Sequence, residues 1–209
     1  MSRNHRNRRD NALQNRRPSS RPGQRSEVRI IGGRWRGRKL RFVATEGLRP
    51  TPDRVRETLF NWLAPVIRGA RCLDLFAGSG ALGLEALSRG AAAVTFVERG
   101  AAAAERLAAT RGELGAEDAE VLCRDAREFL AAPARRFDVV FLDPPFGADL
   151  LPELLPRLAA GGWLAPGAHV YAEAPAASGL PAWPAPLAAH RSGRAGEVGY
   201  HLAVAPAGE

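Results

Sequence analysis

An apolar run that starts at Asp138 ends in Asp143-Pro144-Pro145-Phe146, and these last four residues are suited to holding a flat amine. The Asp143 carboxylate and the Pro144 carbonyl can each accept one hydrogen of an amino group. Pro145 lacks an N–H and stiffens the loop, and Phe146 offers a face on which an aromatic ring can stack. We therefore treat these four residues as the candidate catalytic set.

The four residues resemble the Asp/Asn/Ser-Pro-Pro-aromatic motif of class I S-adenosylmethionine-dependent methyltransferases that modify exocyclic amines, and this resemblance implies an exocyclic amine as the methyl acceptor. An exocyclic amino group of guanine, adenine or cytosine is a poor nucleophile, because its lone pair is delocalised into the ring. Two fixed acceptors can turn that lone pair toward an electrophilic carbon for in-line attack. A carboxylate with an ordinary pKa of about 3.9 cannot deprotonate such an amine outright. Asp143 is therefore assigned to orienting the amine and to stabilising the positive charge that develops on it, with proton release afterwards. The alternative interpretation is a simple turn at the end of a strand.

A second motif, Asp74-Leu-Phe-Ala-Gly78-Ser-Gly80, continues to Gly83 and lies where a predicted strand gives way to a helix. Gly78 and Gly80 permit a turn tight enough for a ligand to lie against the backbone, beyond the carboxyl end of the strand. Glu98 ends the next predicted strand, twenty residues after Gly78, where a carboxylate can accept hydrogen bonds from ribose hydroxyls. The motif therefore predicts a cofactor that carries a nucleoside.

The spacing alone also fits a nicotinamide dinucleotide site, but two acidic residues favour S-adenosylmethionine. Asp74 would repel a pyrophosphate, whereas it suits a zwitterionic amino-acid moiety with a sulfonium nearby. Asp125 follows the third predicted strand and could accept a hydrogen bond from an adenine amino group, although it could instead cap the following helix. The predicted cofactor-binding residues are Asp74, Phe76, Ala77, Gly78, Ser79, Gly80, Glu98, Arg99, Asp125 and Ala126.

Both motifs lie in a stretch, residues 71–204, in which strand-like and helix-like patterns alternate. Strands are predicted at residues 71–76, 93–98, 119–123, 138–142 and 168–173, and helices at residues 80–89, 101–111, 125–131 and 149–160. This alternation predicts parallel βαβ units and hence an α/β fold with a doubly wound, mostly parallel, Rossmann-like sheet. Two further strands, at residues 187–192 and 198–204, should add an antiparallel hairpin and bring the sheet to seven strands.

The amino-terminal part of the chain is strongly basic. Residues 1–56 hold 17 of the 30 Lys and Arg residues but only 4 of the 22 acidic ones, so this part carries a charge of +13 and the remainder −5. Residues 1–27 are predicted to be a disordered basic tail. Residues 28–50 are predicted to be a basic extension in which two strands flank a Gly32-Gly33 turn, and residues 51–209 the main domain.

Within the extension, basic residues alternate with Trp35, Leu40 and Phe42, so a cationic face should lie opposite an apolar one. Such a surface suits phosphates and stacked bases. The predicted RNA-contacting residues are Arg34, Arg36, Arg38, Lys39, Arg49, Arg54 and Arg56.

Thr51 and Pro52 predict the start of a helix, with Thr51 as its N-cap and Pro52 at the first helical position. The two cysteines, Cys72 and Cys123, lie in predicted strands and are interpreted as small core residues; no metal-ligand spacing is present, so no metal site is expected. No apolar run is long enough for a signal-peptide core or a membrane span. We therefore expect a cytoplasmic protein without membrane contact, and a monomer by default.

Three stretches in order resemble the bacterial 16S ribosomal RNA guanine-N2 methyltransferase family, which belongs to the class I S-adenosylmethionine-dependent methyltransferases. They are residues 49–63, residues 74–90 and Asp143-Pro144-Pro145-Phe146, and the resemblance runs from about Val28 to Val204. It implies S-adenosylmethionine as cofactor and the N2 amine of a guanine in 16S ribosomal RNA as methyl acceptor, within an assembled small ribosomal subunit. The tail, residues 1–27, is longer and more basic than the family leads us to expect.

Other functions compete with this one. A DNA methyltransferase acting on adenine N6 or cytosine N4 would use the same Pro-Pro loop, but it usually carries a larger target-recognition region. A basic ribosome assembly factor without catalysis is a second alternative, which the intact Asp74, Gly78, Gly80, Glu98 and Asp143 argue against. A nicotinamide-dependent oxidoreductase would need a hydride-transfer partner near the Pro-Pro loop, and the sequence offers no candidate.

Overall fold

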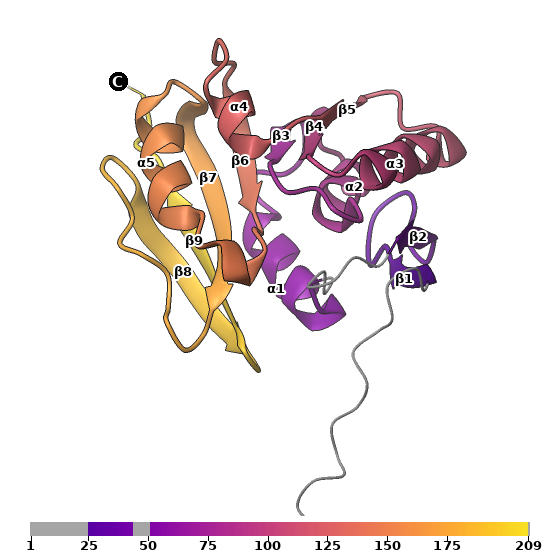
Figure 1. Ribbon diagram of the computed structural model, residues 1–209, viewed down its shortest axis with the longest axis horizontal. Helices are drawn as coiled ribbons and strands as arrows, with labels where there is room; N and C mark the ends of the chain where they lie inside the picture. Colours follow the sequence, from indigo (N-terminus) through magenta and orange to yellow (C-terminus); the bar gives the residue numbers. More distant parts are fainter. Residues whose placement is uncertain (1–24, 44–50, 209) are drawn as a thin grey trace, which may run out of the picture.

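The computed structural model describes residues 25–43 and 51–208, which are arranged around one central sheet (Figure 1). The strand order is β5-β4-β3-β6-β7-β9-β8. The first five of these strands are parallel to one another, and β9 is antiparallel to both β7 and β8. In chain order the strands are β3 (Arg71–Asp74), β4 (Ala93–Glu98), β5 (Ala119–Cys123), β6 (Phe137–Leu142), β7 (Leu164–Pro175), β8 (Ala188–Ala195) and β9 (Val198–Val204). The predicted doubly wound sheet with an antiparallel hairpin is confirmed.

Helices cover both faces of the sheet. One face packs against α1 (Asp53–Leu63), α2 (Ala81–Ser88) and α3 (Ala101–Leu114), and the other against α4 (Ala126–Leu130) and α5 (Leu151–Ala160). Side chains of β6 alternate between the two cores: Val139 and Phe141 face the first group, Val140 and Leu142 the second. Burial on both faces explains why the central strands are apolar throughout. Within the described residues, no helix has both the length and the apolar character to cross a membrane.

Two strands, β7 and β8, are longer than the sequence predicts. β7 begins at Leu164, before the predicted residue 168, because Pro166 and Gly167 form an irregularity inside the strand and do not end it. The final turn is only Gly196 and Glu197, since Ala195 already pairs with Val198. Both differences lengthen strands whose ends contain the residues typical of turns.

The basic extension forms a small antiparallel pair of its own, β1 (Arg25–Arg29) with β2 (Lys39–Val43). β1 therefore begins inside the segment predicted as a tail, residues 1–27; the rest of that segment and residues 44–50 of the predicted extension lie outside the described residues. Val28, Leu40 and Phe42 are buried against the α1–α2–α3 core, while Lys39 and Arg41 are exposed. The predicted cationic face opposite an apolar face is confirmed for β2.

The connection between β1 and β2 is not the tight turn predicted at Gly32-Gly33. It lies instead on the end of α2, where the backbone N–H groups of Arg34 and Trp35 donate to the carbonyl oxygen and to Oγ of Ser88, at 2.8 and 2.9 Å. A Cβ atom on Gly33, whose φ is +77°, would lie 1.8 Å from that carbonyl oxygen. Gly33 therefore permits close approach to a helix, and its carbonyl, which accepts from the Arg36 N–H at 3.2 Å, also begins the wider turn that reverses the chain.

Candidate active site

The turn between β3 and α2 is built around a buried carboxylate. Asp74 is 2% exposed at the end of β3, and its Oδ2 accepts a hydrogen bond from the Gly83 N–H at 3.1 Å. Gly78 and Gly80 have φ of +50° and +74°, in the left-handed region that favours glycine. A Cβ on Gly80 would lie 2.4 Å from Leu107 Cδ1, so a side chain there would collide with α3. The turn is thus a backbone cradle with a carboxylate beneath it.

Burial raises the pKa of Asp74 to about 7. The nearby charge of Glu98 raises the pKa further, whereas the N–H groups of Gly83 and Phe76 lower it by stabilising the carboxylate. Near neutral pH this group therefore changes charge readily. A cationic ligand group beside it would favour the ionised form.

Glu98 connects the cradle to the next strand. Its Oε2 accepts from the Gly78 N–H at 2.9 Å and its Oε1 from the Gly100 N–H at 2.7 Å. A carboxylate has about four acceptor positions, so Glu98 keeps capacity for two hydroxyl donors. The structure brings Glu98 to the cradle as predicted. Of the other predicted cofactor-binding residues nearby, Arg99 is exposed, Phe76 and Ser79 are half-buried and Ala77 is buried.

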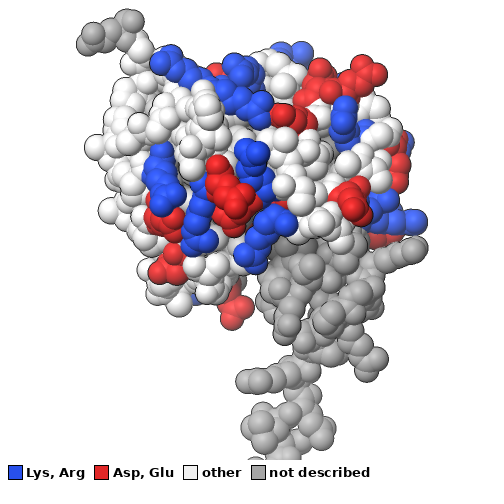
Figure 2. All heavy atoms as spheres, turned by 45° about the horizontal axis from the view of Figure 1, so that its top comes forward, with Lys and Arg blue, Asp and Glu red and all other residues white. Residues whose placement is uncertain are grey.

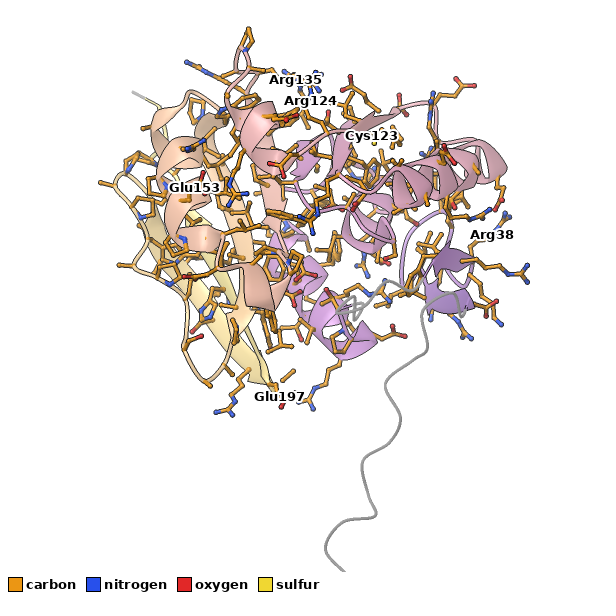
Figure 3. All side chains as sticks on the ribbon, in the orientation of Figure 1. Arg38, Cys123, Arg124, Arg135, Glu153 and Glu197 are labelled. Carbon is orange, nitrogen blue, oxygen red and sulfur yellow. The ribbon has the colours of Figure 1, made fainter. Side chains whose placement is uncertain are left out.

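Asp125 takes the alternative role considered from the sequence, since its Oδ1 caps α4 by accepting from the Arg127 N–H at 2.8 Å. Its second carboxylate oxygen leaves an adenine contact open, and Ala126 beside it is buried. Cys123 and Arg124 precede it at the carboxyl end of β5 (Figure 3). The prediction that Cys123 is a core residue is wrong, because its position at the strand end leaves it exposed; Cys72 is buried as predicted.

The Asp-Pro-Pro-Phe segment follows β6, the strand next to β3. Asp74 pairs with Phe141 in the sheet, so Asp143 leaves the sheet beside the cradle. The negative charge of Asp74 contributes to raising the pKa of Asp143. Pro144 is buried and Pro145 exposed. Phe146 is 40% exposed and is the one large hydrophobic side chain among the described residues that counts as exposed. An exposed aromatic ring thus lies three residues after Asp143, and its use as a stacking surface stays a prediction.

A buried hydrogen-bond network joins Asp143 to three residues that the sequence did not assign to the site, and Thr51 is the one that contacts Asp143 directly. The Thr51 hydroxyl lies 3.2 Å from Asp143 Oδ2 and 2.8 Å from Glu173 Oε1, and the Tyr171 hydroxyl donates to the same Glu173 oxygen at 2.8 Å. All three side chains are buried. The prediction that Thr51 is a helix N-cap is wrong: Pro52 occupies that position without a side-chain bond, because the Thr51 hydroxyl is turned to the two carboxylates. A glutamate inside an apolar strand was the signal that could have identified Glu173.

The pKa values of both carboxyl groups are raised. For Asp143, burial is the largest cause and the charge of Glu173 the second, while the bond to Thr51 opposes them. For Glu173, burial raises the pKa and the bonds to Thr51 and Tyr171 lower it. Two acids that share one hydroxyl cannot both ionise easily.

The predicted RNA-contacting residues divide into those that are exposed, one that the structure does not describe, and one that is buried. Arg34, Arg36, Arg38 and Lys39 of the hairpin and Arg54 of α1 are exposed. Arg49 lies outside the described residues.

Arg56 is a correction to the prediction, because its side chain is fully buried and cannot reach RNA. Its Nη2 donates to the Arg29 carbonyl at 2.8 Å and to Asp53 Oδ1 at 2.6 Å, and its Nη1 lies 3.7 Å from Glu85 Oε2. Glu85 is equally buried and also accepts from the N–H groups of Ile31 and Gly32, at 2.7 and 2.8 Å. This pair attaches the hairpin to α1 and α2.

Charge elsewhere on the molecule is mixed. On the face shown in Figure 2, basic and acidic side chains lie interleaved. On α4 and α5, Arg127 and Arg157 both pair with Glu153, at 2.8 and 3.0 Å. By contrast, Arg34, Arg36 and Arg54 form no salt bridge within the described part of the chain. The hairpin side therefore offers unpaired positive charge close to the catalytic domain.

A cavity of about 280 Å³ lies at the opposite end of the sheet, lined by Arg71, Glu117, Glu120 and Arg135 among others. These residues lie near the amino ends of β3 and β5, whereas ligands of open α/β sheets bind beyond the carboxyl ends. The candidate chemistry is at the carboxyl end, so we assign no role to this cavity. Within residues 25–43 and 51–208, no group of three or more His, Cys, Asp or Glu side chains could hold a metal ion.

Comparison with protein families places these motifs in context. Residues 28–204 match the family model described as Conserved hypothetical protein 95. The ribosomal RNA small subunit methyltransferase D of Escherichia coli (strain K12) is 52% identical over 176 residues, which cover 84% of this chain and 89% of that protein. The protein of the same name from Haemophilus influenzae is 51% identical over 156 residues, covering 73% and 81%.

Solved structures agree with the fold. A methyltransferase structure from Escherichia coli has a TM-score of 0.81 and 51% identity, and the match covers 88% of this chain and all of that one. A 16S rRNA N2 methyltransferase from T. thermophilus, solved with AdoMet and guanosine, has a TM-score of 0.65 at 24% identity and covers 91% of this chain and 52% of that one. The second likeness concerns the fold.

Proposed function

Since this chain belongs to the Conserved hypothetical protein 95 family, with ribosomal RNA small subunit methyltransferases D among its relatives, we propose that it methylates the N2 amine of a guanine in 16S ribosomal RNA. The donor is S-adenosylmethionine, which supplies the methyl group as an electrophilic sulfonium. The relatives' names do not favour the alternatives of a DNA methyltransferase or a non-catalytic assembly factor.

The residues present fit the donor. Gly78 and Gly80 both have positive φ, and a Cβ on Gly80 would collide with Leu107, so the cradle presents bare backbone to a ligand. Glu98 has acceptor capacity for ribose hydroxyls, and Asp125 has one carboxylate oxygen beyond its helix cap for an adenine amino group. Asp74 supplies negative charge for the cationic amino-acid moiety. The side chains that would hold the methyl donor therefore contribute oxygen atoms that accept hydrogen bonds. Such a site suits a cationic nucleoside and not a phosphate.

The methyl acceptor is held by the segment after β6. Asp143 Oδ1 has no hydrogen-bond donor within the described part of the chain, so it is available to an amino hydrogen, and the Pro144 carbonyl can accept the other. The exposed ring of Phe146 gives a base a surface to stack on. Such stacking requires that the base be exposed or flipped out of its own stack.

Arg34, Arg36, Arg38, Lys39 and Arg54 position the RNA through its phosphates. The substrate is the small ribosomal subunit, not naked RNA, and the enzyme acts as a cytoplasmic monomer.

The observation that carries this proposal is the neighbouring position of β3 and β6, which places Asp74 and Asp143 at adjacent strand ends. Asp143→Ala should lower methyl transfer at least about 100-fold, because the amine loses one of its two hydrogen-bond acceptors and the group that receives its proton, while S-adenosylmethionine still binds. Small subunits from a strain lacking the protein, labelled S-adenosylmethionine and mass spectrometry of the labelled nucleotide provide the test. Label on any atom other than guanine N2, or wild-type turnover by Asp143→Ala, would reject the proposal.

A further inference from the structure

Thr51, Asp143, Glu173 and Tyr171 form a continuous hydrogen-bonded chain. It runs from Asp143 Oδ2 to the Thr51 hydroxyl (3.2 Å), then to Glu173 Oε1 (2.8 Å) and the Tyr171 hydroxyl (2.8 Å). Thr51 precedes α1, Asp143 follows β6, and the other two residues belong to β7. Glu173 and Tyr171 are 2% and 0% exposed, so the chain leads from the candidate catalytic carboxylate into the interior.

The number of protons in this chain is limited by chemistry. The Thr51 hydroxyl has one hydrogen, so it can donate to one carboxylate only. If both of its contacts are hydrogen bonds, the other carboxyl group must be protonated and must donate to the hydroxyl oxygen. The Tyr171 hydroxyl also donates to Glu173 Oε1, which makes Glu173 the better-solvated anion of the pair. Before the reaction, therefore, Glu173 is the carboxylate and Asp143 holds the proton.

We propose that Thr51 and Glu173 take up, through Asp143, the proton that the substrate amine loses when it is methylated. This inference rests on the proposed function, because it concerns the same amine. Thr51 and Glu173 act on the substrate only through Asp143, as positioning residues that carry its proton away, and they do not touch the substrate.

Methyl transfer and the proton transfers that follow it conserve atoms and charge. The amine nitrogen forms a bond to the methyl carbon while the carbon–sulfur bond breaks and sulfur keeps its electron pair, which leaves the positive charge on nitrogen. Asp143 Oδ1 then accepts one proton from that nitrogen, and Asp143 Oδ2 passes its own proton to Thr51 Oγ1. The Thr51 hydroxyl passes its hydrogen to Glu173 Oε1. The products are a neutral methylated amine, a neutral thioether and a protonated Glu173.

Within the described residues, two further titratable groups face this chain of hydrogen bonds. The charge of Asp74 on β3 raises the pKa of Asp143, and Tyr200 on β9, paired with Glu173 in the sheet, raises the pKa of Tyr171. Neither forms a hydrogen bond to the chain. Asp74 therefore favours Asp143 as the neutral partner, in agreement with the proton count.

The decisive variants remove or keep the hydroxyl. Thr51→Val has nearly the same shape but cannot pass a proton, so the single-turnover rate at saturating donor should fall about 100-fold at pH 7; Thr51→Ser should stay within about threefold of wild type. Thr95→Val is the matched control: Thr95 is also buried, its hydroxyl also donates to a glutamate (Glu120, 3.1 Å), and it lies on β4 away from Asp143. Equal rates for Thr51→Val and wild type, or equal losses in Thr51→Val and Thr51→Ser, would overturn the relay.

Glu173→Gln tests the final acceptor. Asp143 alone must then ionise, so the acid limb of the rate against pH should move to higher pH and the deficit should shrink as pH rises; an unmoved limb would overturn the proposal. The proton on Asp143 can also be detected without the methyl donor. The measurement is the infrared band of a carboxylic acid at pH 7, in the difference spectrum between the cofactor-free wild type and Asp143→Ala. The band should be present in wild type, and its absence would refute the proton assignment. If wild type itself transfers no methyl group but shows the band, the proposed function fails and the proton assignment stands.

Discussion

Asp74 makes the binding of a cationic cofactor depend on pH near neutrality. An exposed aspartate titrates near 3.8, and Asp74 has a pKa of about 7, so burial disfavours its carboxylate by about 4 kcal/mol. If the cofactor binds the ionised form, its affinity follows the ionised fraction, which is about 3% at pH 5.5 and about half at pH 7.0. The dissociation constant should therefore be about fifteenfold larger at pH 5.5. Both values of pH lie below the usual pKa of an α-amino group, about 7.7, so the amino group of the cofactor stays mostly protonated at both.

Calorimetric titration of S-adenosylmethionine at the two pH values gives this ratio directly, and repeating it in buffers of different ionisation enthalpy counts the protons released. Asp74→Asn cannot titrate, so it should bind more weakly at pH 7.0 and lose most of the pH dependence. Equal dissociation constants for wild type at pH 5.5 and 7.0 would refute the reasoning, because Asp74 would then not respond to the cofactor's charge.

The same pKa fixes the sign of an effect on stability. The folded-state pKa of Asp74 is raised above its unfolded value, so its stabilising contribution is complete below about pH 4 and is lost as pH rises to about 7. Without cofactor, wild type should lose stability relative to Asp74→Asn over this window by up to about 4 kcal/mol. Urea unfolding of both proteins at pH 4.5 and 7.5 measures the difference.

Three further predictions concern the extension and the helix α1 on which it packs. Replacing Arg34, Arg36 and Arg54 together by Ala should reduce the slope of log affinity for single-stranded RNA against log salt by about 2, since each phosphate contact contributes roughly 0.7; filter binding at several salt concentrations measures it, and an unchanged slope would count against phosphate contacts. Gly33→Ala should destabilise the protein by about 2 kcal/mol or more, because its Cβ would meet the Ser88 carbonyl at 1.8 Å. Arg56→Ala should cost about 3 kcal/mol in urea unfolding, whereas the exposed Arg54→Ala should change stability by less than about 0.5 kcal/mol; equal effects would contradict the burial of Arg56.

The sheet and three of the site carboxylates could be predicted because each signal is local. Asp74 and Glu98 each end a strand and Asp143 follows one, and parallel strands bring their carboxyl ends to one edge of the sheet. Thr51 and Glu173 could not be paired with Asp143 in the same way. They come from segments separated by 122 residues, and only the packing of the chain before α1 against β7 brings them together.

Arg56 shows how a residue type can mislead. Its charge suggested solvent and phosphates, but it stands with Leu59, Phe60 and Leu63 at the spacing of one helical face, and that face is buried. Periodicity was the better guide than charge at this position. The Gly32-Gly33 pair misled for a related reason, because two glycines signal a turn and a close backbone approach equally well.

The carboxylate of Glu85 has a consequence for any attempt to shorten this protein. It holds the loop of the hairpin, faces Arg56 and binds Arg89 Nε at 2.7 Å, so three separate parts of the chain depend on one buried anion. Deleting the hairpin would strip that anion of two N–H donors and take the Arg29 carbonyl from the guanidinium opposite. Truncation at the start of the catalytic domain should therefore yield not a smaller enzyme without its RNA-contacting arm, but a polypeptide that unfolds more easily throughout.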